Sequence, residues 1–219
     1  MSRYLTEVVG TFFLVFTIGL TVLDGTPFAP LAIGSALMVM VYMGGHISGA
    51  HYNPAVSIAI LMRGKMKARD FVPYVIAQLL GAVLASLAVL VITGSTFAPA
   101  PGADVGLVAV LLSEALFTFA LALVILNVAT DDATAGNSFY GLAIGFTVMA
   151  GAFSVGGISG GAFNPAVGTG PILIDTFAGD GSLTNLWIYL VGPILGGVAA
   201  AAVFDLQHVG AGEAKDLPQ

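Results

Sequence analysis

A four-residue sequence occurs twice in this chain. The copies are Asn53-Pro54-Ala55-Val56 and Asn164-Pro165-Ala166-Val167. A second tetrapeptide, Leu-Ala-Ile-Gly, begins at Leu31 and again at Leu142, and both pairs are displaced by the same 111 residues. This shared displacement indicates an internal repeat, which we place at about residues 1–100 and 104–208. We expect one domain over residues 1–219, with residues 209–219 as a cytoplasmic tail.

Apolar residues dominate the sequence. Hydrophobic residues make up 58% and charged residues 8% of the 219 residues, whereas soluble domains carry about 25% charged residues. A membrane-spanning helix needs about 20 apolar residues, and Gly, Pro and charged residues divide the sequence into six such segments. They are 4–23, 28–43, 71–92, 106–128, 139–155 and 183–206. We therefore predict an all-α membrane protein that contacts the lipid bilayer over most of its length.

Two further apolar segments are too short to cross a bilayer. They cover residues 48–62 and 159–175, and each begins with a Gly-rich loop and carries Asn-Pro-Ala at the start of its helix. Each half of the repeat thus holds three spans and one short helix. Because three is odd, the second half must run upside down relative to the first, which is the plan of an inverted repeat. The predicted fold has six transmembrane helices and two re-entrant half-helices that enter from opposite sides.

The basic residues fall on one side of this predicted arrangement. They are Arg3, Arg63, Lys65, Lys67, Arg69 and Lys215. All lie at the N-terminus, between the second and third spans, or in the tail, so the positive-inside rule places both termini in the cytoplasm. The formal charge of −6 comes from scattered acidic residues, and this pattern gives no indication of a nucleic-acid partner.

The paired Asn-Pro-Ala motifs indicate a pore. A helix that begins inside the bilayer leaves N–H donors unsatisfied unless protein or a water-filled cavity satisfies them. Pro at the first helical position has no N–H, and the preceding Asn can cap the helix through its carbonyl oxygen while its NH₂ group stays free. We expect Asn53 and Asn164 to point at one spot, where each helix N-terminus adds about half a positive charge. Water there must accept from both amides, which interrupts proton hopping, and the dipoles repel cations.

From Glu7 to Asp205 the chain resembles the aquaporin and glycerol-facilitator family. The resemblance rests on the two motifs, on the Ser-Gly sequence before each, and on residues 45–56, which are close to the family's first pore loop. It implies a passive channel for water or for small uncharged solutes such as glycerol, urea, ammonia or hydrogen peroxide, with protons and ions excluded. It also implies a homotetramer with one pore per subunit. We expect this protein in the cell membrane, which is the inner membrane in a cell that has two.

The same resemblance implies roles for the pore loops and for two buried acids. Backbone carbonyl groups should form a ladder of acceptors along the pore, at Gly49, Ala50, His51, Gly160, Gly161 and Ala162. Glu7 and Glu114 are carboxylates inside apolar segments, and such residues are functional by default. We expect them to accept hydrogen bonds from the pore loops rather than to relay protons.

The chain departs from the family at the expected selectivity filter. Members usually carry Arg directly after the second motif, with an aromatic residue, a His and a small residue nearby, although some plant vacuolar members have Val in place of the Arg. The matching positions in this chain are Ile33, Ala152, Gly161 and Val167. We expect a wider and less polar filter, which lets larger solutes enter but offers fewer groups to replace their hydration water. The sequence leaves open whether Phe153 or Phe163 refills this space.

Two other classes of function need different features. A coupled secondary transporter also uses inverted repeats and interrupted helices, and it stays as the alternative. An enzyme needs a base beside a nucleophile, and the apolar segments offer no Ser–His or Asp–Asp pair, so we predict no enzymatic activity. A metal site needs several convergent ligands, and with no Cys and only His46 and His51 near each other we predict neither metal nor cofactor.

Overall fold

Helices account for nearly all of the chain that the computed structural model describes, residues 1–208. The α-helices are α1 (Ser2–Asp24), α2 (Ala29–Ser48), α3 (Pro54–Met62), α4 (Ala68–Thr93), α5 (Leu107–Ala129), α6 (Tyr140–Ser159), α7 (Pro165–Ala178) and α8 (Leu186–His208), with short 3₁₀ turns at η1 (Asp132–Thr134) and η2 (Leu183–Asn185). Six helices, all except α3 and α7, are long and apolar enough to cross a membrane. The predicted fold class is confirmed. The expected tail at 209–219 lies outside the described residues.

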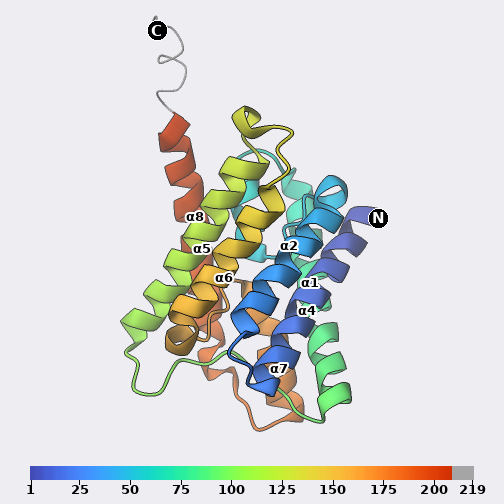
Figure 1. The fold of residues 1–219 in the computed structure, drawn as a ribbon, viewed down its shortest axis with the longest axis vertical. Helices are drawn as coiled ribbons and strands as arrows, with labels where there is room; N and C mark the ends of the chain where they lie inside the picture. The colour runs from blue at the N-terminus through green and yellow to red at the C-terminus, as the bar shows by residue number, and fades with distance from the viewer. Residues whose placement is uncertain (209–219) are drawn as a thin grey trace, which may run out of the picture.

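The two halves of the repeat interlock. Within each half the first and last helices pack together, α1 on α4 and α5 on α8. Between the halves α2 packs on α6, while the short helices cross over, α3 onto α5 and α8 and α7 onto α4. Figure 1 shows that α1 begins and α8 ends toward the same end of the molecule. Each short helix therefore packs against helices of both halves.

Glycines allow the long helices to cross at close range. A Cβ atom on Gly34 of α2 would lie 2.7 Å from the carbonyl oxygen of Gly145 on α6, and one on Gly145 would lie even closer to the carbonyl oxygen of Gly34. Corresponding contacts join Gly81 of α4 to α1 and Gly196 of α8 to α5. Small residues at such crossings let helix backbones approach within a membrane, where van der Waals packing stabilises helix pairs.

The short helices begin at the Asn-Pro-Ala motifs, as the sequence predicted, with Pro54 and Pro165 as their first residues. The remainder of the expected segments 48–62 and 159–175 consists of the last residue of α2 or α6 and the loop after it, and α7 continues to Ala178. The second span also continues past its predicted end at residue 43. Its Gly44 leaves room for the Tyr52 hydroxyl group, where a Cβ atom would clash, and the helix ends at Gly49, whose φ of 84° is left-handed.

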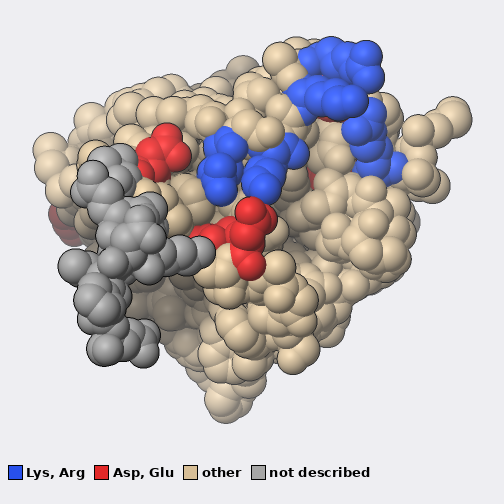
Figure 2. All heavy atoms as spheres, turned by 90° about the horizontal axis from the view of Figure 1, so that it is seen from above, with Lys and Arg blue, Asp and Glu red and all other residues tan. Residues whose placement is uncertain are grey.

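Polar and apolar residues are distributed as expected for a protein surrounded by lipid. Large apolar side chains such as Ile76, Val91 and Leu195 are exposed on the outer surface, whereas the carboxylates of Glu7 and Glu114 are fully buried. Basic side chains gather at one end of the molecule, which Figure 2 views from above. In the described chain they are Arg3, Arg63, Lys65, Lys67 and Arg69. We call this end the basic face.

Candidate pore and selectivity region

Each half-helix begins with the same cap. Asn53 and Asn164 are extended residues, and their side-chain oxygens accept hydrogen bonds from the backbone N–H groups of Ala55 and Ala166, both at 2.9 Å. Pro occupies the first helical position in both cases, where its missing N–H costs nothing. The local sequence alone therefore sets the two helix starts.

The two asparagine amides also join the halves of the repeat. Nδ2 of Asn53 donates to the carbonyl oxygen of Phe163 at 2.9 Å, and Nδ2 of Asn164 donates to that of Tyr52 at 2.8 Å. We expected the NH₂ group of each asparagine to stay free. Instead, one of its two N–H groups donates to a backbone carbonyl oxygen of the opposite loop. One N–H of each amide is left for the lumen.

Glu7 anchors the first pore loop, residues 49–53. Its Oε1 accepts from the Ser48 hydroxyl at 2.7 Å and from the backbone N–H of His51 at 3.0 Å. Its Oε2 accepts from the N–H of Tyr52 at 2.7 Å and from Nε2 of Gln78 at 2.8 Å. Four donors therefore converge on one buried carboxylate, which satisfies the lone pairs of both oxygens.

Glu114 anchors the second loop, residues 160–164, in the same way. It accepts from the Ser159 hydroxyl at 2.7 Å and from the N–H groups of Ala162 at 3.0 Å and Phe163 at 2.7 Å. Phe163, like Tyr52 in the first loop, has a left-handed backbone with φ near 50°, a conformation that is uncommon for bulky residues. The hydrogen bonds to the carboxylate hold this strained backbone in place.

Three carbonyl groups in each loop have no hydrogen-bond donor among the described residues. Within residues 1–208 no protein group donates a hydrogen bond to the carbonyl oxygens that the sequence singled out. They belong to Gly49, Ala50, His51, Gly160, Gly161 and Ala162. All six residues line cavities. The loops thus present unpaired acceptors next to the space that a solute would occupy.

A cavity of about 390 Å³ passes between the loops and the long helices. Its lining includes both capping asparagines and all four predicted filter residues, Ile33, Ala152, Gly161 and Val167. No Lys, Arg, Asp or Glu belongs to this lining in the described chain. The wall opposite the loops is therefore aliphatic and uncharged.

Of the two candidate aromatic residues only Phe163 reaches the filter, where it belongs to the cavity lining and its Cζ would lie 3.6 Å from a Cβ atom on Gly161. Phe153 lies on the outer surface of α6 with 56% of its area exposed. Phe163 is buried, and its ring packs against Phe117 with the ring centroids 5.4 Å apart. A Cβ atom on Gly151 of α6 would lie 2.8 Å from this ring. The ring therefore fills space between α5 and α6. The filter keeps the small side chains that the sequence indicates.

Several lining residues were not among the sequence candidates. Ile144 and Val56 line the same cavity, and they stand 111 residues from Ile33 and Val167. Applying the repeat displacement to the filter positions would have found both. Leu121 and Ile125 of α5 and the stretch 97–100 also line the cavity, but no motif marks them.

A second cavity of about 370 Å³ lies on the side of the basic face. Its lining includes Arg3, Lys65 and Lys67, together with Asp70. The guanidinium group of Arg3 donates to the Asp70 carboxylate at 2.9 Å. The cavity therefore forms a charged vestibule, in contrast to the uncharged cavity beyond it.

Six long helices around an uncharged cavity, with two capped half-helices meeting inside it, define a membrane channel whose pore lies within one chain. A family model described as major intrinsic protein matches residues 1–204, and the chain belongs to this family.

Curated relatives and a solved structure agree with this assignment. The chain is 39% identical to Aquaporin NIP1-1 of Zea mays over 216 residues, which cover 94% of this chain and 74% of that protein. It is also 39% identical to Glycerol uptake facilitator protein-like 6 of Lactiplantibacillus plantarum over 215 residues, which cover 92% and 95%. The X-ray structure of the aquaglyceroporin from Plasmodium falciparum matches with a TM-score of 0.85 and 25% identity, covering 97% of this chain and 98% of that chain. The chain is thus a passive transmembrane channel and not an enzyme.

Proposed function

We propose that this channel conducts water together with small uncharged solutes of about the size of glycerol. The observation that carries the proposal is the filter, whose four residues Ile33, Ala152, Gly161 and Val167 all line the cavity and carry no aromatic or cationic side chain. Such a filter sets a low steric barrier, because all four side chains are aliphatic or absent. Aquaporins and a glycerol uptake facilitator among the relatives are consistent with both kinds of cargo.

The two walls of the cavity suit an uncharged molecule with hydroxyl or amide groups. Its O–H or N–H groups can donate to the unpaired carbonyl oxygens of the loops, while its carbon atoms contact the aliphatic wall. Glycerol and urea have both kinds of surface, and water needs only the carbonyl groups. In this proposal Glu7 and Glu114 are positioning residues, because they hold the loops that present the carbonyl groups.

Ion exclusion rests on the middle of the pore. The remaining N–H of Asn53 and of Asn164 donates to a passing water molecule, which then cannot donate in turn to either amide. The N-termini of α3 and α7 add two positive dipole ends at the same place. An ion would also lose hydration in a cavity without a charged lining residue, and an uncompensated buried charge is very costly.

Light scattering of proteoliposomes after rapid mixing tests the conducted solutes. Osmotic shrinkage reports water flux, and re-swelling in glycerol or urea reports solute flux, with empty vesicles as the blank. We expect water and glycerol fluxes well above the blank, while a pH-sensitive dye inside the vesicles detects no added proton flux. Water flux without any solute flux would refute the proposed selectivity, and a proton flux would refute the proposed exclusion.

We further propose an orientation and an assembly. The gathering of basic residues on one face supports placing that face, and with it both chain ends, in the cytoplasm. A homotetramer in the cell membrane, with one pore in each copy, follows from the family resemblance. Light scattering coupled to size-exclusion chromatography in detergent measures the copy number, and protease protection in sealed vesicles reports the orientation.

A further inference from the structure

The pore has two cavities, and their linings overlap at only two residues of the described chain. The larger cavity contains the filter residues and the capping asparagines, and the smaller one is the vestibule on the basic face. His51 and Ile125 belong to both linings. The two cavities therefore adjoin at these two side chains.

The imidazole ring of His51 is held by contacts on two sides. Its Nδ1 lies 3.0 Å from the Ser57 hydroxyl oxygen, which also accepts from Nε2 of Gln78 at 3.0 Å. The ring packs against Tyr74 with centroids 5.0 Å apart. Gln78 donates in addition to Glu7. The ring is thus tied to the same network as the loop backbone and is not free to swing aside.

The second half of the repeat has no equivalent of this arrangement. At the displacement of 111 residues His51 corresponds to Ala162 and Ser57 to Gly168. Neither an imidazole ring nor a hydroxyl group to hold one is present there. The two ends of the pore are therefore unequal, and the held imidazole ring belongs to the end toward the basic face.

We propose that His51 and Ile125 form the principal constriction of this channel, so that size selection occurs there rather than at the four filter residues. The imidazole ring supplies a polar side, through Nε2, and Ile125 supplies an apolar side. The gap fits an uncharged solute with a hydrogen-bonding edge and a hydrocarbon edge, such as a short-chain polyol. This inference rests on the proposed solute conduction, and the experiment below separates the two.

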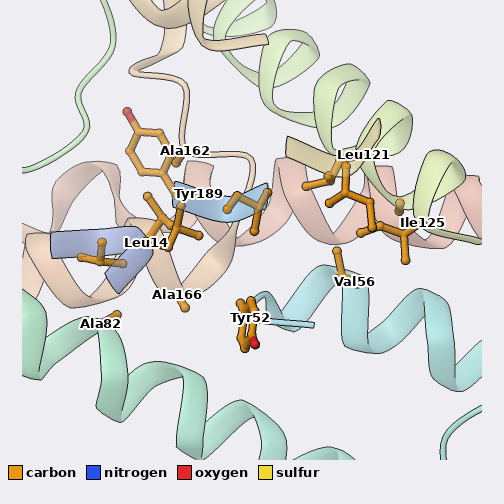
Figure 3. Packing of buried hydrophobic residues seen from close by; sticks show 14 of the residues in the cluster. Leu14, Tyr52, Val56, Ala82, Leu121, Ile125, Ala162, Ala166 and Tyr189 are labelled. Atoms are coloured by element: carbon orange, nitrogen blue, oxygen red, sulfur yellow. The ribbon is translucent and has the colours of Figure 1, made fainter. Parts of the chain in front are cut away.

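The structure offers a matched control for Ile125 on the same helix. Leu121 lies one turn earlier on α5, is similarly buried, and lines only the larger cavity. Figure 3 shows both side chains on α5, with Val56 of α3 nearby. Truncating Leu121 enlarges a part of the lumen that is already open, whereas truncating Ile125 enlarges the constriction itself.

The experiment compares Ile125→Ala, Leu121→Ala, Ile125→Phe and wild type in proteoliposomes, with polyols of three, four and five carbons as probes. We expect Ile125→Ala to raise the flux of the four- and five-carbon polyols several-fold, and Leu121→Ala to raise it far less. Ile125→Phe should lower polyol flux more strongly than water flux. Circular dichroism and vesicle content check that each variant is folded and inserted, and Ile125→Val replaces the Ala variant if that one does not fold.

The outcomes distinguish the two proposals. If wild type conducts no polyol at all, the proposed solute conduction fails, yet a selective gain in Ile125→Ala would still locate the size barrier at the constriction. If Leu121→Ala raises polyol flux as much as Ile125→Ala, or if neither Ile125 variant alters it, the constriction lies elsewhere and this inference is wrong.

Discussion

Replacing Glu114 by Gln tests whether one buried carboxylate holds the second pore loop. Oε1 accepts from Ser159 and Ala162, whereas Oε2 accepts only from the N–H of Phe163. A Gln side chain therefore costs least when its NH₂ group faces Phe163, whose N–H then has no acceptor. Leaving a buried donor unsatisfied costs about 1–3 kcal/mol, and we expect the free energy of unfolding to fall by that amount in Glu114→Gln.

The Ala variant at the same position sets the scale. Glu114→Ala removes both acceptors and leaves the N–H groups of Ala162 and Phe163 without partners, so its loss should be about twice as large by the same measure. Flux should fall in the same order, because Phe163 also provides the carbonyl group to which Asn53 donates. The order expected for both quantities is wild type, then Gln, then Ala.

Unfolding by SDS in mixed micelles, followed by circular dichroism, measures the free energies, and proteoliposome light scattering measures the fluxes. Asp24→Asn serves as the control, because Asp24 is an exposed carboxylate at the end of α1. If Glu114→Ala unfolds within about 0.5 kcal/mol of wild type, the typical range for surface substitutions, the loop does not depend on the carboxylate. Equal losses for Gln and Ala would contradict the assignment of separate roles to the two oxygens.

Three shorter predictions address other regions. Val167→Arg places a guanidinium group in the aliphatic filter, so glycerol flux should fall more than water flux in proteoliposomes; equal losses would contradict the proposed role of this position. Gly145→Val inserts side-chain atoms where α2 and α6 touch through Gly34, and overpacking of this kind typically costs about 1–3 kcal/mol, which SDS unfolding measures. Asp131 accepts from the backbone N–H of Ala133 and contacts His208, and these bonds lower its pKa. Because the folded pKa lies below the unfolded one, the contribution of Asp131 to stability is present at neutral pH and is lost as acidification passes the folded pKa. Asp131→Asn should therefore expose the end of α8 to hydrogen exchange at neutral pH, and its difference from wild type should vanish in acid.

Local chemistry explains which parts of the fold could be predicted. Pro54 and Pro165 begin the half-helices because Asn suits the N-cap position and Pro the first helical position, and hydropathy read together with Gly, Pro and charged residues separates the six spans. The end of α2 was missed because Gly44 and the following glycine suggested a break. In the structure both glycines are helical, Gly44 facing Tyr52 and Gly45 facing Tyr140, and no local pattern reveals a contact made after the chain has turned back.

The pore was predictable to a similar extent. Counting from the motifs located Ile33 and Val167, since each stands at a fixed distance from a capped helix. The hydrogen bonds from Asn53 and Asn164 to the opposite loop were missed. Their acceptors are backbone carbonyl groups, which every residue has, so no residue type in the sequence marks them. Ile125 was missed for a related reason, since it belongs to a continuous apolar run in which every position looks alike.

The exchange of amide hydrogen bonds between the halves bears on how such a chain can arise. Asn53 bonds to the residue before Asn164, and Asn164 bonds to the residue before Asn53. Reciprocal contacts of this kind are typical of a symmetric dimer, in which both subunits contribute the same surface patch to the interface. Two separate copies of one half, inserted in opposite directions, would make the same pair of bonds. Fusing their genes would preserve every such contact, while freeing His51 and Ala162 to diverge and giving the pore two different ends.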